Sequence, residues 1–177
     1  MYKLLLVDDE YMILEGLKYL LPWQALGFEI VQTCRSAKEA LVYLEAHPID
    51  LLITDITMPE MSGIEMVSQA QSQGNFFATI ILSGYQEFTY VKQGMQLGVK
   101  NYLVKPVDKE ELLTTVNKVK LELDNQVTLA LQQQAYVENH LIRWLNDDLN
   151  EREFQEMLTS YGVLDQGPYT VIQLVAS

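Results

Sequence analysis

The sequence predicts an α/β fold in which five parallel strands alternate with helices on both faces of the sheet. Short apolar runs alternate with segments of helical apolar spacing, which is typical of repeated strand-helix units with right-handed crossovers. Four of the apolar runs end in polar groups: Asp8, Asp55, Ser83 and Lys105. Because the carboxyl ends of parallel strands converge on one crevice, we expect these groups to meet there.

The first strand is predicted over residues 3–7, where the nearly continuous apolar run is typical of a central strand covered on both faces. Apolar residues then recur at helical spacing over residues 10–21, and Pro22 ends this helix. The second strand is expected over residues 29–35.

A capping pattern marks the second helix, and a buried strand follows it. Ser36 with Glu39 is a capping box, in which the side chains bond free backbone groups of the first turn, and it opens a helix over residues 37–46. Residues 49–54 are apolar and are predicted to form the third strand. This strand ends at Asp55, the residue that we expect to carry the chemistry.

The same capping pattern recurs at Ser62 with Glu65 and begins the third helix. A strand over residues 77–82 and a helix over residues 87–97 are expected next. Gly94 lies inside that helix and costs up to about 1 kcal/mol relative to alanine, so we expect this helix to be the least rigid.

The fifth strand is predicted over residues 101–104, and Asp108 with Glu111 caps the helix after it. Residues 107–161 contain neither glycine nor proline, so we expect this helix to continue as a connector to about residue 145. Three further segments are expected: a break at residues 146–148, a helix over residues 150–161 and a strand over residues 169–176. A strand so near the last residue, with nothing to pair it, indicates a chain cut from a longer protein.

Composition limits the partners of the chain. Its 177 residues suffice for one domain and part of a second, and its formal net charge is −12. That charge opposes binding to nucleic acid, because proteins bind nucleic acid largely through Lys and Arg.

Cys34 is the single cysteine, which excludes an internal disulfide and indicates a reducing compartment. There is no signal peptide and no apolar run of membrane length, so we expect a cytoplasmic protein without membrane contact.

Several motifs together resemble the receiver domain of bacterial two-component response regulators, over about residues 1–120. They are the pair Asp8-Asp9, the pattern Asp-x-x-Met-Pro-x-Met-x-Gly over residues 55–63, the hydroxyl of Ser83, and Lys105-Pro106. Two further runs, Leu21-Pro22-Trp23 with Gly27-Phe28-Glu29 and residues 83–88, are similar to receivers fused to AraC-type DNA-binding domains.

The resemblance favours one strand order. The pattern of strand-helix units alone leaves both 2-1-3-4-5 and 3-2-1-4-5 open. The family implies 2-1-3-4-5, a doubly wound sheet in which the first and third strands are neighbours. Asp8, Asp9 and Asp55 would then approach one another. Close carboxylates repel unless a cation intervenes, and Mg²⁺ favours such oxygen ligands.

By the same resemblance, Asp55 is the nucleophile that accepts a phosphoryl group and becomes an aspartyl phosphate. The family implies that Asp9, Asp55 and the backbone carbonyl of Thr57 bind Mg²⁺ directly, whereas Asp8 acts mostly through water. The chain would catalyse only its own phosphorylation and dephosphorylation, and would not be an enzyme in the usual sense.

Three other residues acquire expected roles from the resemblance. Lys105 binds phosphoryl oxygens with its ammonium group, and Ser83 is the hydroxyl residue that senses the phosphate. Tyr102 is the aromatic switch whose ring turns inward when that hydroxyl moves. The Lys105–Pro106 peptide bond is expected to be cis.

The implied partners are a sensor histidine kinase as phosphodonor and a second copy of the chain. We expect a receiver over residues 1–120, a fifth helix and connector over residues 109–148, and the start of an output domain over residues 149–177. DNA would be reached only through a missing C-terminal domain.

An apolar seven-residue series predicts how two copies pair. Positions 116, 123, 130, 137 and 144 hold Val, Leu, Ala, Val and Trp, a pattern suited to a two-stranded seam. The alternative is that this stripe packs on the missing domain of the same chain.

Three rival functions agree less well with the sequence. An enzyme of the haloacid-dehalogenase type also uses an Asp nucleophile, but its second Asp is replaced here by Thr57. A receiver-like interaction module that never takes phosphate would not need Asp9, Asp55, Ser83 and Lys105 together. Dinucleotide binding would require a glycine-rich turn after the first strand, which this sequence lacks.

Overall fold

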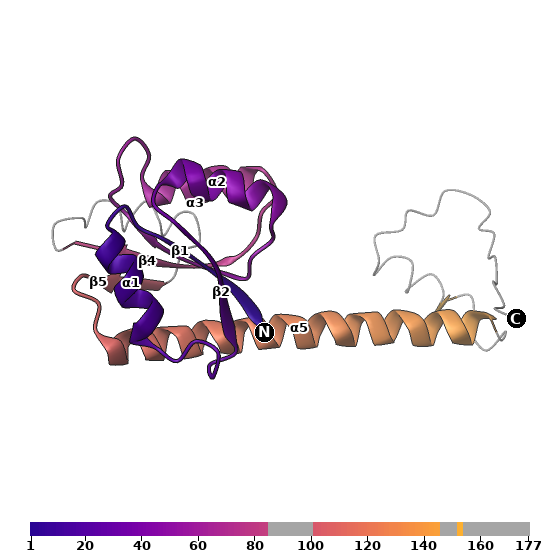
Figure 1. The fold of residues 1–177 in the computed structure, drawn as a ribbon. Coiled ribbons are helices and arrows are strands. Elements are labelled where there is room, and N and C mark those ends of the chain that lie inside the picture. The colour runs from indigo at the N-terminus through magenta and orange to yellow at the C-terminus, as the bar shows by residue number, and fades with distance from the viewer. Residues whose placement is uncertain (85–100, 146–151, 154–177) are drawn as a thin grey trace, which may run out of the picture. The chain divides into compact units, whose positions relative to one another are not determined.

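The computed structural model describes residues 1–84, 101–145 and 152–153 (Figure 1). Within them, five parallel strands form one sheet in the order β2-β1-β3-β4-β5. The strands are β1 (Tyr2–Val7), β2 (Phe28–Cys34), β3 (Leu51–Asp55), β4 (Ala78–Ser83) and β5 (Asn101–Val104). The helices are α1 (Tyr11–Leu20), α2 (Ala37–Ala46), α3 (Gly63–Ser72) and α5 (Lys109–Leu145). The predicted doubly wound α/β fold, its strand order and its long C-terminal helix are confirmed.

Several expected elements lie outside the described residues. They are the helix over residues 87–97, the break at residues 146–148, most of the helix over residues 150–161 and the strand over residues 169–176.

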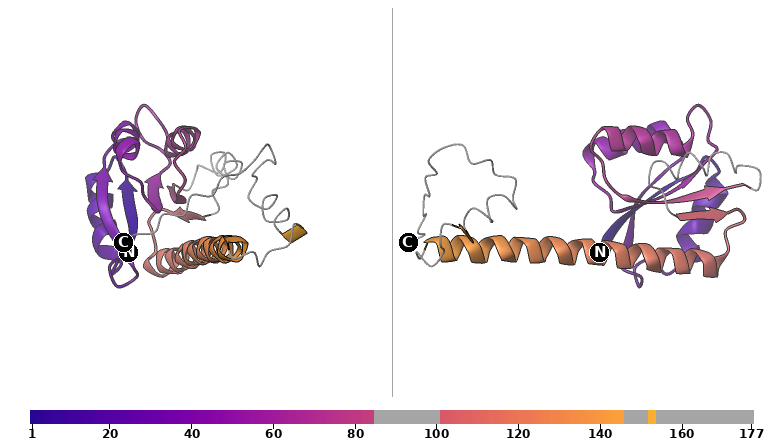
Figure 2. Two further views of the ribbon diagram at one scale, coloured as in Figure 1. Left: turned by 90° about the vertical axis from the view of Figure 1, so that its right-hand side faces the viewer. Right: turned by 180° about the vertical axis from the view of Figure 1, so that it is seen from behind.

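Helices cover both faces of the sheet (Figures 1 and 2). Leu5 and Leu52 point to one face, where they pack with side chains of α2 and α3. Leu4 and Ile53 point to the other face, where they pack with α1 and the first part of α5. Successive side chains of a strand point to opposite faces, so the unbroken apolar runs of β1 and β3 are buried on both sides.

The helix starts show the capping contacts that the sequence predicts. Ser36 Oγ accepts a hydrogen bond from the backbone N–H of Glu39, and Ser62 with Glu65 forms a complete capping box. Asp108 Oδ1 accepts two backbone N–H groups in the first turn of α5. The cap at Ser62 fixes where α3 begins and so places Gly63 against the end of β3.

The chain divides into two compact units, and the division falls within α5. The first unit is Met1–Asp124 and the second is Asn125–Ser177.

No helix of the described residues is long and apolar enough to cross a membrane.

In the first unit, α5 contributes to the core. Leu112, Val116 and Val119 are fully buried and Leu123 is 9% exposed, all of them in the cluster beneath the sheet. The predicted dimer seam is therefore wrong at positions 116 and 123. Helical apolar spacing shows that one face of a helix is covered, but it does not distinguish the chain's own core from a partner helix.

Candidate functional site

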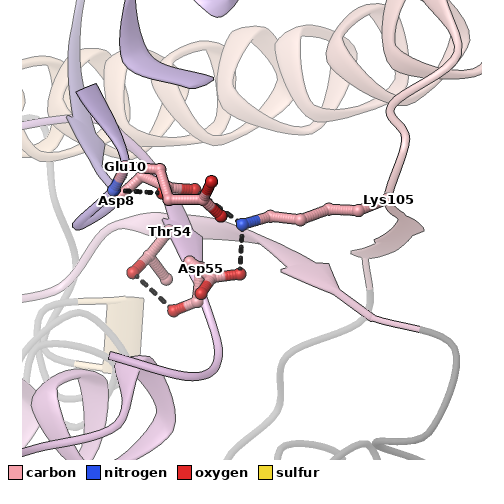
Figure 3. A network of polar contacts seen from close by, with 5 residues as sticks. All are labelled: Asp8, Glu10, Thr54, Asp55 and Lys105. Atoms are coloured by element: carbon pink, nitrogen blue, oxygen red, sulfur yellow. Dashed lines mark hydrogen bonds and ion pairs between the residues drawn. The ribbon is translucent and has the colours of Figure 1, made fainter. Parts of the chain in front are cut away.

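Lys105 lies between two buried carboxylates at the carboxyl edge of the sheet (Figure 3). Its Nζ is 2.8 Å from Asp8 Oδ2 and 2.7 Å from Asp55 Oδ1. Asp8 is fully buried and Asp55 is 6% exposed. Asp8 follows β1 and Asp55 ends β3, and these strands are paired neighbours in the sheet. The parallel order thus brings three of the expected site residues into contact.

The charges of this trio stabilise one another. Buried carboxylates are costly unless they are paired, and the Lys105 ammonium supplies the opposite charge. Burial by itself would lower the pKa of Lys105, but the hydrogen bonds and charges of Asp55 and Asp8 outweigh burial and raise that pKa. Lys105 therefore stays protonated at neutral pH. Two carboxylates against one ammonium leave a surplus negative charge in the site.

The acidic pair after β1 is held by backbone contacts. Asp8 Oδ1 accepts the N–H of Glu10 at 2.9 Å, and the N–H of Asp8 donates to the carbonyl of Cys34 at 3.2 Å. Asp9 is half-buried, and its carbonyl accepts a hydrogen bond from Arg35 Nη2 at 3.2 Å. Asp8 thus contacts Lys105, whereas the direct Mg²⁺ ligand that the resemblance implies in this pair is Asp9.

The donor set of the site fits a hard divalent cation. Within the described residues, no three side chains of His, Cys, Asp or Glu form a ready metal-binding group. Mg²⁺, however, commonly uses only one or two carboxylates and keeps several waters. Asp8 and Asp55 offer oxygen ligands with surplus negative charge, and Asp9 follows Asp8 directly in the sequence.

The backbone around Asp55 is closely packed. Thr54 Oγ1 donates a hydrogen bond to the Asp55 carbonyl at 3.0 Å. Gly63 packs beside both groups, because a Cβ added there would collide with the Asp55 carbonyl oxygen and crowd Thr54 Oγ1. Ile56 donates to the carbonyl of Leu82 at 3.0 Å and accepts from the N–H of Gly63 at 2.8 Å. The sequence analysis missed Thr54, and its one available signal was a hydroxyl residue inside an apolar strand.

The expected switch residues lie near this trio. Ser83 ends β4, is 4% exposed, and its carbonyl accepts the backbone N–H of Lys105 at 2.8 Å. Tyr102 is half-buried on β5 and packs against the core on the side of α2 and α3, and this burial raises its pKa. The Lys105–Pro106 bond is cis, as expected.

Thr57 lies in the loop between β3 and α3. Its side chain is exposed, and it lines a pocket of about 240 Å³ together with neighbours such as Glu60 and Met61. The structure therefore places Thr57 two residues from Asp55, on the open side of the loop.

Comparison with known proteins gives consistent matches. The chain matches the response regulator receiver domain over residues 4–117. It is 36% identical over 129 residues to YesN of Bacillus subtilis (strain 168), an uncharacterized transcriptional regulatory protein, and the match covers 71% of the chain. The match covers 34% of YesN, so the chain spans about a third of that relative's length.

Solved structures agree with this match. The REC domain of the response regulator AraT from Geobacillus stearothermophilus has a TM-score of 0.65 and 34% identity, and the match covers 71% of this chain and 97% of that one. A two-component transcriptional regulator AraC from Clostridium phytofermentans has a TM-score of 0.63 and 29% identity, over 76% and 99% of the two chains. A CheX-CheY-BeF3-Mg complex from Borrelia burgdorferi has a TM-score of 0.60 and 30% identity, over 67% and 88%.

Proposed function

The chain belongs to the response regulator receiver domain family, and we propose that Asp55 accepts a phosphoryl group from a partner histidine kinase. The observation that carries this proposal is the contact of the buried Asp55 carboxylate with the Lys105 ammonium at 2.7 Å. A nucleophilic carboxylate beside a fixed positive charge is the arrangement that phosphoryl transfer requires, because catalysis there depends on positioning and charge neutralisation.

In the proposed reaction, an Asp55 carboxylate oxygen attacks the phosphorus atom of a phosphodonor. A new phosphorus–oxygen bond forms, and the bond to the donor's histidine nitrogen breaks. Lys105 stabilises the negative charge on the phosphoryl oxygens. Mg²⁺, when held by Asp8, Asp9, Asp55 and the carbonyl of Thr57, supplies further charge neutralisation.

We propose that Ser83 and Tyr102 report the modification. Ser83 ends β4, which pairs with β3 as far as Asp55, and its carbonyl accepts the backbone N–H of Lys105, so we expect its hydroxyl to reach a phosphoryl group on Asp55. Tyr102 lies on β5, three residues before Lys105, and is half-buried, so we expect its ring to become more buried when the site changes. A charge change at Asp55 would thereby alter the surface around β5.

We propose that the output is control of transcription in the cytoplasm. The receiver would be residues 1–120, the helix and connector residues 109–148, and the start of an output domain residues 149–177. The likeness to YesN and to the AraC regulator of Clostridium phytofermentans supports an AraC-type DNA-binding domain beyond this chain. A chain with a net charge of −12 would reach DNA only through such a domain.

We also propose a homodimer formed through residues 125–145 of α5. In this segment Val127, Leu129, Leu131, Tyr136 and Ile142 are 49–63% exposed. Large apolar side chains on several sides of one helix are typical of a helix that is covered by a partner. Residues 125–137 carry no charged side chain, so two copies with a net charge of −12 each can meet there with little repulsion.

Analytical ultracentrifugation of the chain tests whether a second copy covers residues 125–145 of α5. The wild type should be a dimer, and Leu131→Glu should be a monomer because it buries a charge in the proposed interface. Val42→Glu is the control, since Val42 is similarly exposed on α2. A wild type that stays monomeric at high concentration would leave this face to a missing domain of the same chain and refute the dimer.

The phosphoacceptor proposal is tested by intact mass after incubation with acetyl phosphate and Mg²⁺. The wild type should gain one phosphoryl group and Asp55→Asn none. Asp108→Asn serves as the control, because asparagine also caps a helix and Asp108 lies outside the site. No gain in the wild type, or a gain that persists in Asp55→Asn, would refute the proposal.

A further inference from the structure

Thr54 is a polar side chain inside an otherwise apolar strand, and it contacts the residue that carries the proposed chemistry. It is fully buried, and its Oγ1 donates to the Asp55 carbonyl at 3.0 Å. Figure 3 shows this bond beside the ion pair of Asp55 with Lys105. A buried hydroxyl is costly unless it forms a hydrogen bond, so Thr54 is tolerated at this position because it bonds Asp55.

The carbonyl that Thr54 contacts has little freedom. Thr54 Oγ1 donates a hydrogen bond to it, and Gly63 packs so closely beside both groups that no Cβ would fit there. The peptide unit is planar, so fixing the direction of this carbonyl fixes the backbone dihedral of Asp55 that follows its Cα. The direction of the Asp55 side chain from that Cα is then fixed as well.

We propose that Thr54 is a positioning residue for phosphorylation of Asp55. Its hydroxyl fixes the backbone at the end of β3, so that the Asp55 carboxylate stays against Lys105 at 2.7 Å. This inference rests on the proposed phosphoacceptor role of Asp55. Transfer rates depend steeply on geometry, and a displacement of about 1 Å can cost about 100-fold. Loss of the Thr54 hydrogen bond would loosen only the peptide unit that follows Asp55, so we expect it to slow phosphorylation by about tenfold.

Two pairs of variants isolate the hydroxyl. Thr54→Val keeps the shape of the side chain and removes the donor, whereas Thr54→Ser keeps the donor. Thr54→Ser and Thr54→Ala form a second pair, whose members differ by the hydroxyl alone. Thr79→Val is the matched control: Thr79 is a buried threonine of β4, and within the described residues its Oγ1 has no hydrogen-bond partner.

The experiment measures two quantities on the whole chain. The first is the rate of phosphorylation by acetyl phosphate with Mg²⁺, followed by intact mass. The second is the ¹³C chemical shift of the Asp55 backbone carbonyl, which responds to loss of a hydrogen bond whether or not phosphate is present. We expect Thr54→Val to be about tenfold slower with a changed carbonyl shift. Thr54→Ser and Thr79→Val should keep both values close to the wild type.

The outcomes separate this inference from the proposed function. A wild type that takes up no phosphoryl group refutes the phosphoacceptor role itself, and the positioning role with it. If the wild type and Thr54→Val are both phosphorylated at the same rate, only the positioning role of Thr54 is refuted. If Thr54→Val fails to fold, equal rates for Thr54→Ser and Thr54→Ala refute that role.

Discussion

The Lys105 ammonium lies 2.7 Å from the Asp55 carboxylate, and it contacts the buried Asp8 carboxylate at 2.8 Å from the same position. Lys105 is therefore the internal counter-ion of the acidic site as well as the expected phosphate-binding group. A divalent cation held by Asp8 and Asp55 would compete with Lys105 for the negative charge of these two carboxylates. This competition makes the site's stability and metal affinity depend on one side chain.

Replacing Lys105 by Met should therefore have opposite effects on stability and metal binding. Without Mg²⁺ we expect the free energy of unfolding to fall by about 2 kcal/mol or more, because two buried carboxylates lose their counter-ion. Mg²⁺ affinity should rise, because the competing ammonium is gone. Thermal unfolding with and without Mg²⁺ measures both effects. Lys120→Met, which removes an exposed ion pair with Asp124, is the control. Equal stabilisation of wild type and Lys105→Met by Mg²⁺ would count against this account.

Replacing two glycines by alanine should change the free energy of unfolding in opposite directions. Gly63→Ala places a Cβ against the Asp55 carbonyl, and we expect a loss of about 1–3 kcal/mol together with slower phosphorylation. Gly16→Ala is the control, because nothing lies within 4 Å of a Cβ built there and Gly16 is inside α1. It should stabilise by up to about 1 kcal/mol. Urea unfolding measures both values, and a neutral Gly63→Ala would disprove the close contact.

Two leucines of α5 test whether the first part of this helix belongs to the core. Leu112 is fully buried beneath the sheet, whereas Leu121 is 62% exposed on the same helix. Leu112→Ala should reduce the free energy of unfolding by about 2–5 kcal/mol, and Leu121→Ala by less than about 0.5 kcal/mol. Denaturant unfolding of the two variants compares them directly. Similar losses in both would mean that this part of α5 does not form the core.

A hydrogen bond at the end of the first unit makes a prediction about pH. Tyr2 Oη donates to Asp124 Oδ1 at 2.7 Å, and this bond, helped by burial, raises the pKa of Tyr2 to about 12. A raised pKa means that the bond stabilises the fold below pH 10 and that this contribution is lost as the pH rises through 12. NMR titration of the Tyr2 ring should show the high pKa in the wild type and a fall toward 10.0 in Asp124→Asn. An unchanged pKa in that variant would exclude Asp124 as the cause.

Much of the fold follows from local signals in the sequence. The apolar run that ends at Asp55 gives β3, and the side-chain cap at Ser36 and the capping box at Ser62 give the starts of α2 and α3. The strand order did not follow from local signals. The pattern of strand-helix units allowed two orders, and only the family resemblance favoured the observed one. Pairing of distant strands leaves little trace in local spacing.

The sequence predicted which residues meet at the site but not which contacts they make there. Asp8, Asp55 and Lys105 were predicted as site residues because each follows an apolar run that forms a strand. That Asp8 is the fully buried partner of Lys105 depends on how the strand ends lie in three dimensions. Thr54 was missed for a related reason: a threonine in a strand is ordinary, and its bond to Asp55 depends on a backbone conformation that no sequence pattern reports.

The most direct test of the central claim is to locate the phosphoryl group in the chain. Borohydride reduces an aspartyl phosphate to homoserine, a stable change that peptide mass mapping can place at one residue. After treatment with acetyl phosphate, Mg²⁺ and borohydride, we predict homoserine at position 55 and unmodified aspartate at positions 8 and 9. Homoserine at either of those two positions, or at none, would contradict the assignment of Asp55 as the phosphoacceptor.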